Sequence, residues 1–258
     1  MAEVDRIGAR LRRTAGRGER LLVVYLTVGD PVTPNDLAVA VAQAGADVLE
    51  LGIPTPSTAP RGAEIAHSFD RARDHTPHQA WKLVGELRAR LPDTPLITLV
   101  YPSTVTDLGP HGVLSACQES GVDGLVLTDP DGDLTSATVA DTDLSAIPLI
   151  RQGTGSPHRL EATARHLTYR PLAPRTGDLL NRTEAHRAAE ATAATATRPF
   201  LAGFGLRTEH DIRAVVPHAA GVVLGSELYR GLTTRPPPER TPWATGAVQR
   251  WKTATALP

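Results

Sequence analysis

A single carboxylate interrupts an otherwise apolar run in the first quarter of the chain. Glu50 lies in the segment Val48–Pro54, which reads VLELGIP. Strands of a parallel sheet are almost continuously apolar, so a glutamate there indicates either an ion-paired, solvated strand end or a functional group. A carboxyl group buried in an apolar pocket keeps its proton to higher pH, which suits general acid or base catalysis. Glu50 is therefore the first candidate for catalysis.

Two glycine-containing turns near the C-terminus form a second pattern. Gly203-Phe204-Gly205 follows one apolar run, and Gly225-Ser226 follows the next and opens a helical stretch, GSELYRGL. Glycine lets backbone N–H groups approach an anion, and a helix N-terminus adds the positive end of its dipole. Glycine also simply ends strands, but two such turns in successive units favour a phosphate site. We therefore expect a phosphorylated small molecule as the substrate.

Other catalytic chemistries have little support in the residue types. The only lysines are Lys82, in a helical stretch, and Lys252, near the C-terminus, so a lysine imine is not expected. His75 and His78 are separated by a proline and have no third ligand placed beside them, which argues against a metal site. The single cysteine, Cys117, excludes an intramolecular disulfide and a multi-cysteine metal centre. We expect no metal and no cofactor.

These candidates need a scaffold that brings strand ends together, and the hydrophobic pattern predicts one. Short apolar or β-branched runs recur about every 29 residues, near the length of a βα unit, and each is followed by a turn and a helical stretch. The eight runs are Leu21–Thr27, Ala46–Gly52, Pro95–Tyr101, Gly124–Thr128, Pro148–Arg151, His166–Arg170, Pro199–Gly203 and Gly221–Leu224. They predict an α/β fold, a single-domain (β/α)8 TIM barrel.

A doubly wound open sheet is the alternative, because the fifth and sixth runs are weak as strands. The glycine motif after Ala202 argues against it, since it lacks the third glycine of a dinucleotide fingerprint and comes late in the chain. We expect an N-terminal helix covering the barrel in residues 1–20, the barrel in 21–232, and a Pro-rich C-terminal tail with a short helix in 233–258.

Polar residues finish most of the predicted strands. In a barrel the active site lies at the C-terminal ends of the strands, so these residues are the ones expected to meet. They are Thr27, Asp30, Glu50, Tyr101, Asp129, Arg151 and Tyr169.

Charge and hydropathy exclude several other classes of protein. The formal net charge of −1 gives no electrostatic footprint for nucleic acid or an anionic membrane. The chain has no apolar run of the roughly 18 residues needed to cross a bilayer and no signal-peptide core at its start. We therefore expect a cytoplasmic protein that binds neither nucleic acid nor membrane.

Five segments, taken together, resemble the tryptophan synthase α subunit family. They are YLTVGDP (Tyr25–Pro31), GADVLELGIP (Gly45–Pro54), SGVDGLVLTDP (Ser120–Pro130), AGFGL (Ala202–Leu206) and GVVLGS (Gly221–Ser226). The resemblance runs from about Leu21 to Leu232 in the family's order. It implies a TIM barrel descended from an aldolase (lyase) that splits indole-3-glycerol phosphate into indole and glyceraldehyde 3-phosphate without metal or lysine imine. It also implies a partner, the tryptophan synthase β subunit.

The resemblance implies roles for individual residues. Glu50 matches the family's catalytic glutamate, which moves protons at the indole carbon and at the glycerol hydroxyl, and Tyr169 matches a tyrosine beside the glycerol phosphate. The positions that match the indole pocket are Tyr25, Thr27, Leu99, Tyr101 and Asp129. The positions that match or adjoin the phosphate site are Gly177, Gly203, Phe204, Gly205, Gly225 and Ser226.

The resemblance breaks shortly after Glu50. The family reads E-L-G-x-P-F-S-D-P-x-A-D-G-P, and Arg61 stands where the family has the aspartate that anchors the indole N–H and stabilises positive charge on the ring. Removing such a group costs about 10²- to 10⁴-fold in rate. Residues 55–58 and 170–175 also depart from the family, which predicts weaker coupling to a β-like subunit. The alternative is that Arg61 extends into solvent.

These observations leave three hypotheses for the function. The leading one is a diverged lyase, isomerase or cyclase, with specialised metabolism as one setting for it, in which Glu50 transfers protons on a phosphorylated or diphosphorylated small molecule. In it Arg61, with Arg151 or Arg175, clamps a second phosphate or a carboxylate. The second is a genuine α subunit in which Asp129 has taken over the aspartate's role. The third is a catalytically inactive, phosphate-binding regulatory subunit.

Overall fold

Eight parallel strands form one sheet in the computed structural model, which describes residues 5–57, 62–173, 178 and 180–257. The strands are β1 (Leu21–Thr27), β2 (Val48–Gly52), β3 (Leu96–Val100), β4 (Gly124–Leu127), β5 (Ser145–Pro148), β6 (Thr168–Pro171), β7 (Phe200–Gly203) and β8 (Gly221–Leu224). Their order across the sheet is β5-β4-β3-β2-β1-β8-β7-β6.

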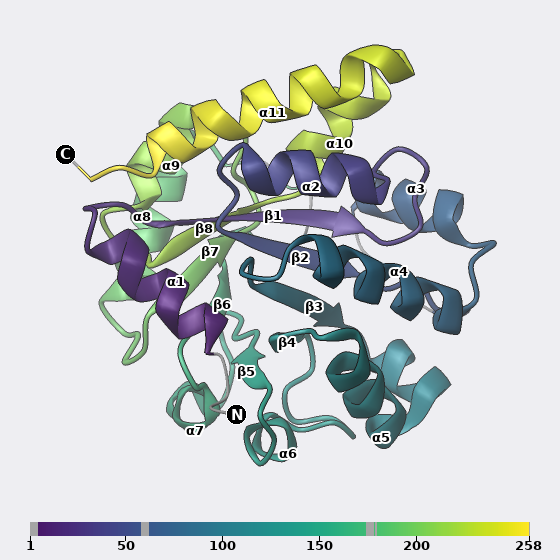
Figure 1. Ribbon diagram of the computed structural model, residues 1–258. Helices are drawn as coiled ribbons and strands as arrows, with labels where there is room; N and C mark the ends of the chain where they lie inside the picture. The colour runs from purple at the N-terminus through teal and green to yellow at the C-terminus, as the bar shows by residue number, and fades with distance from the viewer. Residues whose placement is uncertain (1–4, 58–61, 174–177, 179, 258) are drawn as a thin grey trace.

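The two ends of this sheet meet, which closes it into a barrel (Figure 1). Leu149, just after β5, forms a parallel bridge with Tyr169 of β6, and the N–H of Ile150 donates to the carbonyl of Tyr169 at 2.9 Å. The expectation of a (β/α)8 TIM barrel is therefore confirmed.

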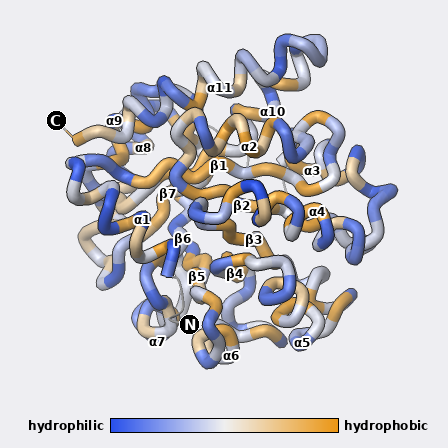
Figure 2. Tube along the Cα trace, in the orientation of Figure 1, coloured by the Kyte–Doolittle hydropathy of each residue, from blue (hydrophilic) through white to orange (hydrophobic). Residues whose placement is uncertain are grey.

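Helices cover the outside of the barrel (Figure 1). They are α1 (Arg6–Ala15), α2 (Asn35–Gln43), α3 (Ala63–Ala72), α4 (Pro77–Arg90), α5 (Pro102–Ser120), α6 (Ser136–Ala140), α7 (Pro157–Thr163), α8 (Arg182–Ala193), α9 (Glu209–Val215), α10 (Ser226–Thr233) and α11 (Pro237–Ala254). The larger apolar core lies between strands and helices, and a smaller one fills the barrel interior. Figure 2 shows the strands as an apolar centre within more polar helices.

The fifth strand lies earlier in the chain than the sequence pattern predicts. The apolar run Pro148–Arg151 was expected to be the strand, but β5 is Ser145–Pro148. Extended backbone continues past Pro148 as the bridge at Leu149, so the run follows the strand and closes the barrel. Each of the other seven predicted runs overlaps a strand, and β1 and β8 begin and end at the predicted residues.

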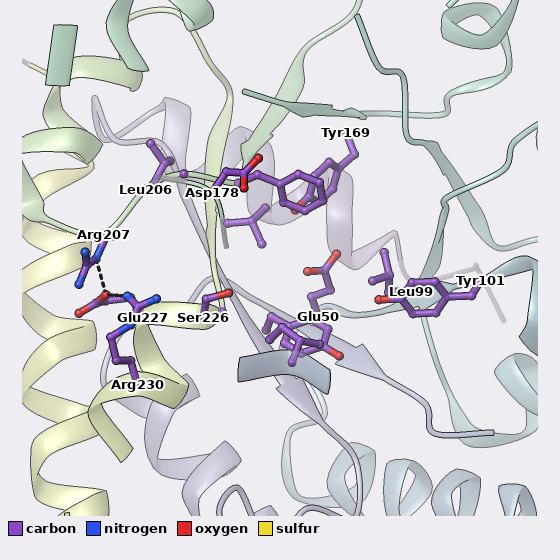
Figure 3. A pocket seen from close by; sticks show the side chains of 16 residues that line it. Glu50, Leu99, Tyr101, Tyr169, Asp178, Leu206, Arg207, Ser226, Glu227 and Arg230 are labelled. Atoms are coloured by element: carbon purple, nitrogen blue, oxygen red, sulfur yellow. Dashed lines mark hydrogen bonds and ion pairs between the residues drawn. The ribbon is translucent and has the colours of Figure 1, made fainter. Parts of the chain in front are cut away.

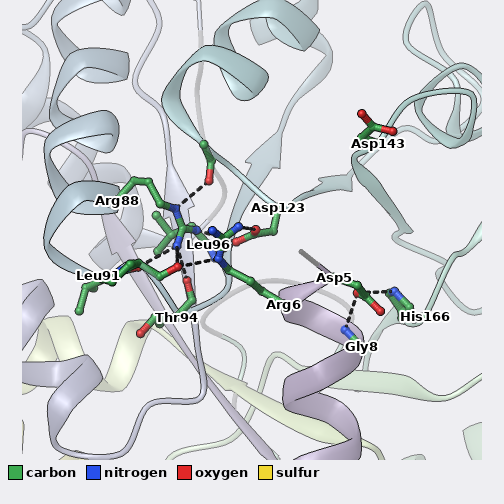
Figure 4. A network of polar contacts seen from close by, with 12 residues as sticks. Asp5, Arg6, Gly8, Arg88, Leu91, Thr94, Leu96, Asp123, Asp143 and His166 are labelled. Carbon is green, nitrogen blue, oxygen red and sulfur yellow. Dashed lines mark hydrogen bonds and ion pairs between the residues drawn. The ribbon is translucent and has the colours of Figure 1, made fainter. Parts of the chain in front are cut away.

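Helix α1 covers the N-terminal end of the barrel. Ile7 is 2% exposed and belongs to the same apolar cluster as Val23 inside the barrel. Arg6 contacts one carboxylate oxygen of Asp123 at 2.9 Å, and Arg88 contacts the other at 2.6 Å (Figure 4). These contacts hold α1 across the N-terminal end of the barrel.

Helix α11 is longer than the short helix expected in residues 233–258. It has 18 residues and contacts α2, α9 and α10. Pro237 and Pro238 stand in its first turn, where a missing N–H costs no helical hydrogen bond. Within the described residues, none of the helices has the length and apolar character that a membrane span requires.

Candidate active site

A pocket opens at the C-terminal ends of the strands, where Glu50 projects from β2 (Figure 3). Residues from most of the strands or the loops that follow them contribute to its wall. The lining residues are Tyr25, Glu50, Ile65, Leu99, Tyr101, Tyr169, Asp178, Phe204, Gly205, Leu206, Arg207, Val223, Gly225, Ser226, Glu227 and Arg230. The wall is apolar around Glu50 and charged at the start of α10.

The side chain of Glu50 is directed into the barrel by strand geometry. Glu50 pairs with Tyr25 of β1 and Ile97 of β3, and alternate residues of a strand face the same side of a sheet. Val48, two residues earlier, belongs to the apolar cluster inside the barrel, so Glu50 shares that face. The functional interpretation of the interrupted apolar run fits this orientation better than a solvated strand end.

Burial changes the protonation of Glu50. The residue is 2% exposed, and its Oε1 has no hydrogen-bond partner among the described residues. Without a partner, the charged form loses its hydration and gains nothing in return, which raises the pKa of Glu50 to about 8. Near neutral pH the side chain is therefore an un-ionised carboxylic acid that holds a proton inside the pocket.

Three tyrosines surround this carboxyl group. Burial is the main cause that raises the pKa of Tyr25, Tyr101 and Tyr169, and the nearby Glu50 charge raises each pKa further. Their phenols therefore remain protonated. Phe69 meets the Tyr101 ring edge-on at 6.3 Å between centroids and completes an apolar wall. This side of the pocket suits a flat, apolar group of a substrate.

The opposite side, which we call the glycine end, consists of Phe204, Gly205, Gly225 and Ser226. Phe204 and Gly205 both have positive φ, 66° and 88°. A Cβ on Gly205 would also lie 2.8 Å from Leu180 Cγ, so this turn requires glycine. Gly225 caps α10 without a side-chain hydrogen bond, which leaves the first N–H groups of the helix available to a ligand. This geometry is suited to an anion.

Charged residues that the sequence did not single out border the glycine end. Oε2 of Glu227 accepts hydrogen bonds from Nε of Arg207 at 2.9 Å and from Arg230 at 2.5 Å. Arg230 also donates to Glu64 of α3 at 2.6 Å. Arg207 directly precedes Thr208, the N-cap of α9, and sequence spacing alone could not show that the Arg207 side chain reaches the pocket.

Several predicted site residues meet in this pocket, and others do not. Those that line it are Tyr25, Glu50, Leu99, Tyr101, Tyr169, Phe204, Gly205, Gly225 and Ser226. Gly203 lies beneath Tyr169, since a Cβ there would be 2.1 Å from the phenol oxygen. Arg61 and Gly177, and also Arg175, lie outside the described residues. Arg151 borders a different cavity, although its charge acts on Tyr169.

Two residues expected in the indole pocket have other positions. Thr27 is fully buried, and its hydroxyl lies 2.6 Å from that of Ser68, where it supports Tyr25 rather than the pocket surface. Asp129 borders a separate cavity beside Pro102, because the backbone turns away after β4 ends at Leu127. Neither residue is among those that line the pocket containing Glu50.

The segment after β2 is held against α5. The N–H and hydroxyl of Ser57 donate to the two carboxylate oxygens of Asp107 at 3.0 and 2.8 Å. Hydrogen bonds from the side chains of Thr55 and Ser57 and from the Ser57 backbone lower the pKa of Asp107, so it remains a carboxylate. We call these two hydrogen bonds from Ser57 to Asp107 the Ser57 clamp. They fix the first residues of the loop that follows β2.

Comparison with known proteins places the barrel in a family. Residues 11–248 match the family model described as tryptophan synthase alpha chain. The chain belongs to the tryptophan synthase alpha chain family. It is 32% identical over 240 residues to the tryptophan synthase alpha chain of Xanthomonas oryzae pv. oryzae strain PXO99A, with 88% of this chain and 89% of the relative covered. It is 29% identical over 234 residues to that of Novosphingobium aromaticivorans, covering 85% and 86%.

Solved structures of the family have the same fold. The tryptophan synthase alpha chain from Legionella pneumophila subsp. pneumophila superposes with a TM-score of 0.83 at 23% identity, covering 98% of this chain and 97% of that one. A chain of Mycobacterium tuberculosis tryptophan synthase gives a TM-score of 0.82 at 21% identity, covering 98% and 99%. The family membership predicted from the five sequence segments is confirmed.

Proposed function

We propose that the chain is a lyase-type enzyme in which Glu50 transfers protons on a phosphorylated small molecule held at the glycine end of the pocket. The observation that carries the proposal is the buried Glu50 carboxyl, whose Oε1 has no partner and whose pKa is raised to about 8. A buried carboxyl group that lines a pocket, lacks a protein partner and has a strongly shifted pKa is typical of a functional site.

The family's reaction shows how this carboxyl group can act. In its protonated form Glu50 gives a proton to the ring carbon of an indole-like group, and the ring becomes positively charged. The resulting carboxylate takes the proton of the neighbouring glycerol hydroxyl as the carbon–carbon bond breaks and an aldehyde forms. The electrons of the broken bond neutralise the ring, and Glu50 regains its proton. The apolar wall around Tyr101 accepts the ring, and the glycine end accepts the phosphate.

The identity of the substrate depends on Arg61. A cation at the place of the family's aspartate opposes positive charge on an indole ring, which supports a diverged enzyme with impaired indole release. Its substrate is then another phosphorylated or diphosphorylated molecule, and its reaction is a lyase, isomerase or cyclase step. This enzyme needs no metal and no lysine imine, because Glu50 supplies both proton transfers.

A genuine tryptophan synthase alpha chain is the second candidate, and the relatives' names favour it. Both curated relatives described above carry that name. In this case the chain cleaves indole-3-glycerol phosphate and pairs with a tryptophan synthase β subunit. Another group must then supply the charge stabilisation of the missing aspartate, and Asp129, the candidate from the sequence, borders the neighbouring cavity.

Release of indole from indole-3-glycerol phosphate distinguishes these candidates. The assay uses the purified chain with and without a tryptophan synthase β subunit, beside Arg61→Asp and Glu50→Gln. Glu190→Gln, at an exposed site on α8, is the matched control. If the wild type releases no indole and Arg61→Asp does, the result supports the diverged enzyme. If the wild type releases indole and Glu50→Gln does not, the result supports the genuine alpha chain. Wild-type activity that persists in Glu50→Gln would contradict the role of Glu50.

A further inference from the structure

Arg207 is a cation of the pocket to which the proposed function assigns no role. It lines the pocket beside the glycine end, and its side chain is 38% exposed. Its Nε donates to Glu227 at 2.9 Å, and its two terminal nitrogens donate no hydrogen bond to a residue that the structure describes. A guanidinium held at Nε presents its remaining donors as a fixed fork, which matches the oxygens of a phosphate or carboxylate.

A chain of charged contacts sets the position of this guanidinium. Arg230 donates hydrogen bonds to Glu64 on α3 and to Glu227. Glu227 also accepts a hydrogen bond from Arg207. Figure 3 shows Arg207 and Arg230 beside Glu227, close to Ser226 at the start of α10. Arg230 lies between the two carboxylates, and each of its three side-chain nitrogens donates a hydrogen bond to one of them. Arg207 is therefore the cation of this cluster that is free to bind a ligand.

The glycine end can hold one phosphate without Arg207. The turn at Phe204 and Gly205 and the uncapped start of α10 offer backbone N–H groups and the positive end of a helix dipole. The pocket wall also contains the carboxylates of Glu227 and Asp178, which oppose an anion, while Glu50 is un-ionised near neutral pH. An arginine with free donors beside a backbone site for one phosphate indicates a second negative group on the ligand.

We propose that the substrate carries two adjacent acidic groups of the diphosphate type, the first bound by the backbone of the glycine end and the second by Arg207. Glu227 is a positioning residue in this proposal, since it holds the guanidinium by Nε without touching the ligand. The inference rests on the proposed function, because it assigns the substrate class of the same pocket.

Calorimetric titration of the full chain with inorganic phosphate and with inorganic diphosphate tests the proposal. The wild type is expected to bind diphosphate about tenfold more tightly than phosphate, the effect of one charge-assisted contact. Arg207→Gln is expected to lose that preference and to keep its affinity for phosphate. Arg250→Gln is the matched control, because Arg250 is paired with Glu209 away from the pocket and its loss should change neither affinity.

A second pair of variants tests the role of Glu227. Glu227→Gln keeps an oxygen that can accept the hydrogen bond from Nε of Arg207. The ratio of diphosphate affinity to phosphate affinity should therefore stay near the wild-type value, even if both affinities rise. Glu227→Ala removes the acceptor, so the ratio should fall toward that of Arg207→Gln. Thermal unfolding of each variant checks that the barrel is folded.

Two results would overturn the proposal while leaving the proposed function intact. One is a wild type that binds phosphate and diphosphate equally. The other is an Arg207→Gln variant that loses the same factor for both anions, since Arg207 would then bind the first phosphate. If neither anion binds the wild type, the phosphate site fails, and the proposed function fails with it.

Discussion

Replacing Glu50 with glutamine removes an acidic group from the pocket floor and changes how stability depends on pH. The folded-state pKa of about 8 lies above the ordinary value of 4.5, so the folded chain binds this proton more tightly than the unfolded chain. Stability is therefore lost as the pH rises from about 4.5 to about 8, and the full cost is present above that range. Glutamine carries no such proton.

The size of the effect follows from the two pKa values. The difference between the pKa values of 4.5 and about 8 corresponds to about 5 kcal/mol of unfolding free energy, of which roughly 3.5 kcal/mol develops between pH 5 and pH 8. The glutamine amide is itself buried without an assigned partner, which adds a cost of about 1–3 kcal/mol that does not depend on pH. The pH dependence of the difference between the two proteins is therefore the quantity to measure.

Urea unfolding at pH 5, 6, 7 and 8, followed by tryptophan fluorescence, measures this difference. The unfolding free energy of the wild type minus that of Glu50→Gln should fall by roughly 3.5 kcal/mol from pH 5 to pH 8. The exposed control Glu190→Gln should show no comparable trend. A Glu50→Gln difference that stays constant over this range would refute a raised pKa and the un-ionised acid inferred from it.

Three further substitutions test other parts of the account. Gly203→Ala places a Cβ 2.1 Å from the Tyr169 phenol oxygen, so it should cost about 1–3 kcal/mol of stability and lower turnover. An unchanged Tm would contradict the close approach of Tyr169 to Gly203. Glu161→Gln removes the negative charge that lies 2.6 Å from buried Arg170 and should lower the Tm by several degrees, because the guanidinium charge then has no counter-charge; wild-type thermal unfolding would contradict this. Asp107→Ala releases Ser57 and should speed proteolysis near residue 57 with little change in Tm; unchanged cleavage would exclude the Ser57 clamp.

The strands were predictable because each is a short apolar run bounded by turn residues. Leu21–Thr27 and Gly221–Leu224 have the predicted bounds, since both are buried along their whole length. The β5 prediction was displaced because Pro148–Arg151 is as apolar as a strand, and only the pairing with β6 shows that Leu149 closes the barrel instead. Burial of Cys117 in α5 was also predictable from the helical pattern around it.

The site was predictable where strand periodicity decides direction and unpredictable where loops decide it. Glu50 stands out because it breaks an apolar strand, and the strand geometry then directs it into the barrel. Asp129 follows a strand end, where the alternation of faces no longer applies, and it lies in another cavity. Arg207 and Glu227 required the structure, because only the packing of α10 against the loop after β7 brings them together.

A carbon-13 NMR titration of the Glu50 side-chain carboxyl, assigned by its loss in Glu50→Gln, tests the central claim most directly. The claim is that the pocket holds an un-ionised carboxylic acid near neutral pH. The predicted result is a resonance that titrates in the folded chain with a pKa of about 8. A titration near the ordinary value of 4.5 would show a carboxylate in the pocket at neutral pH and would contradict the account.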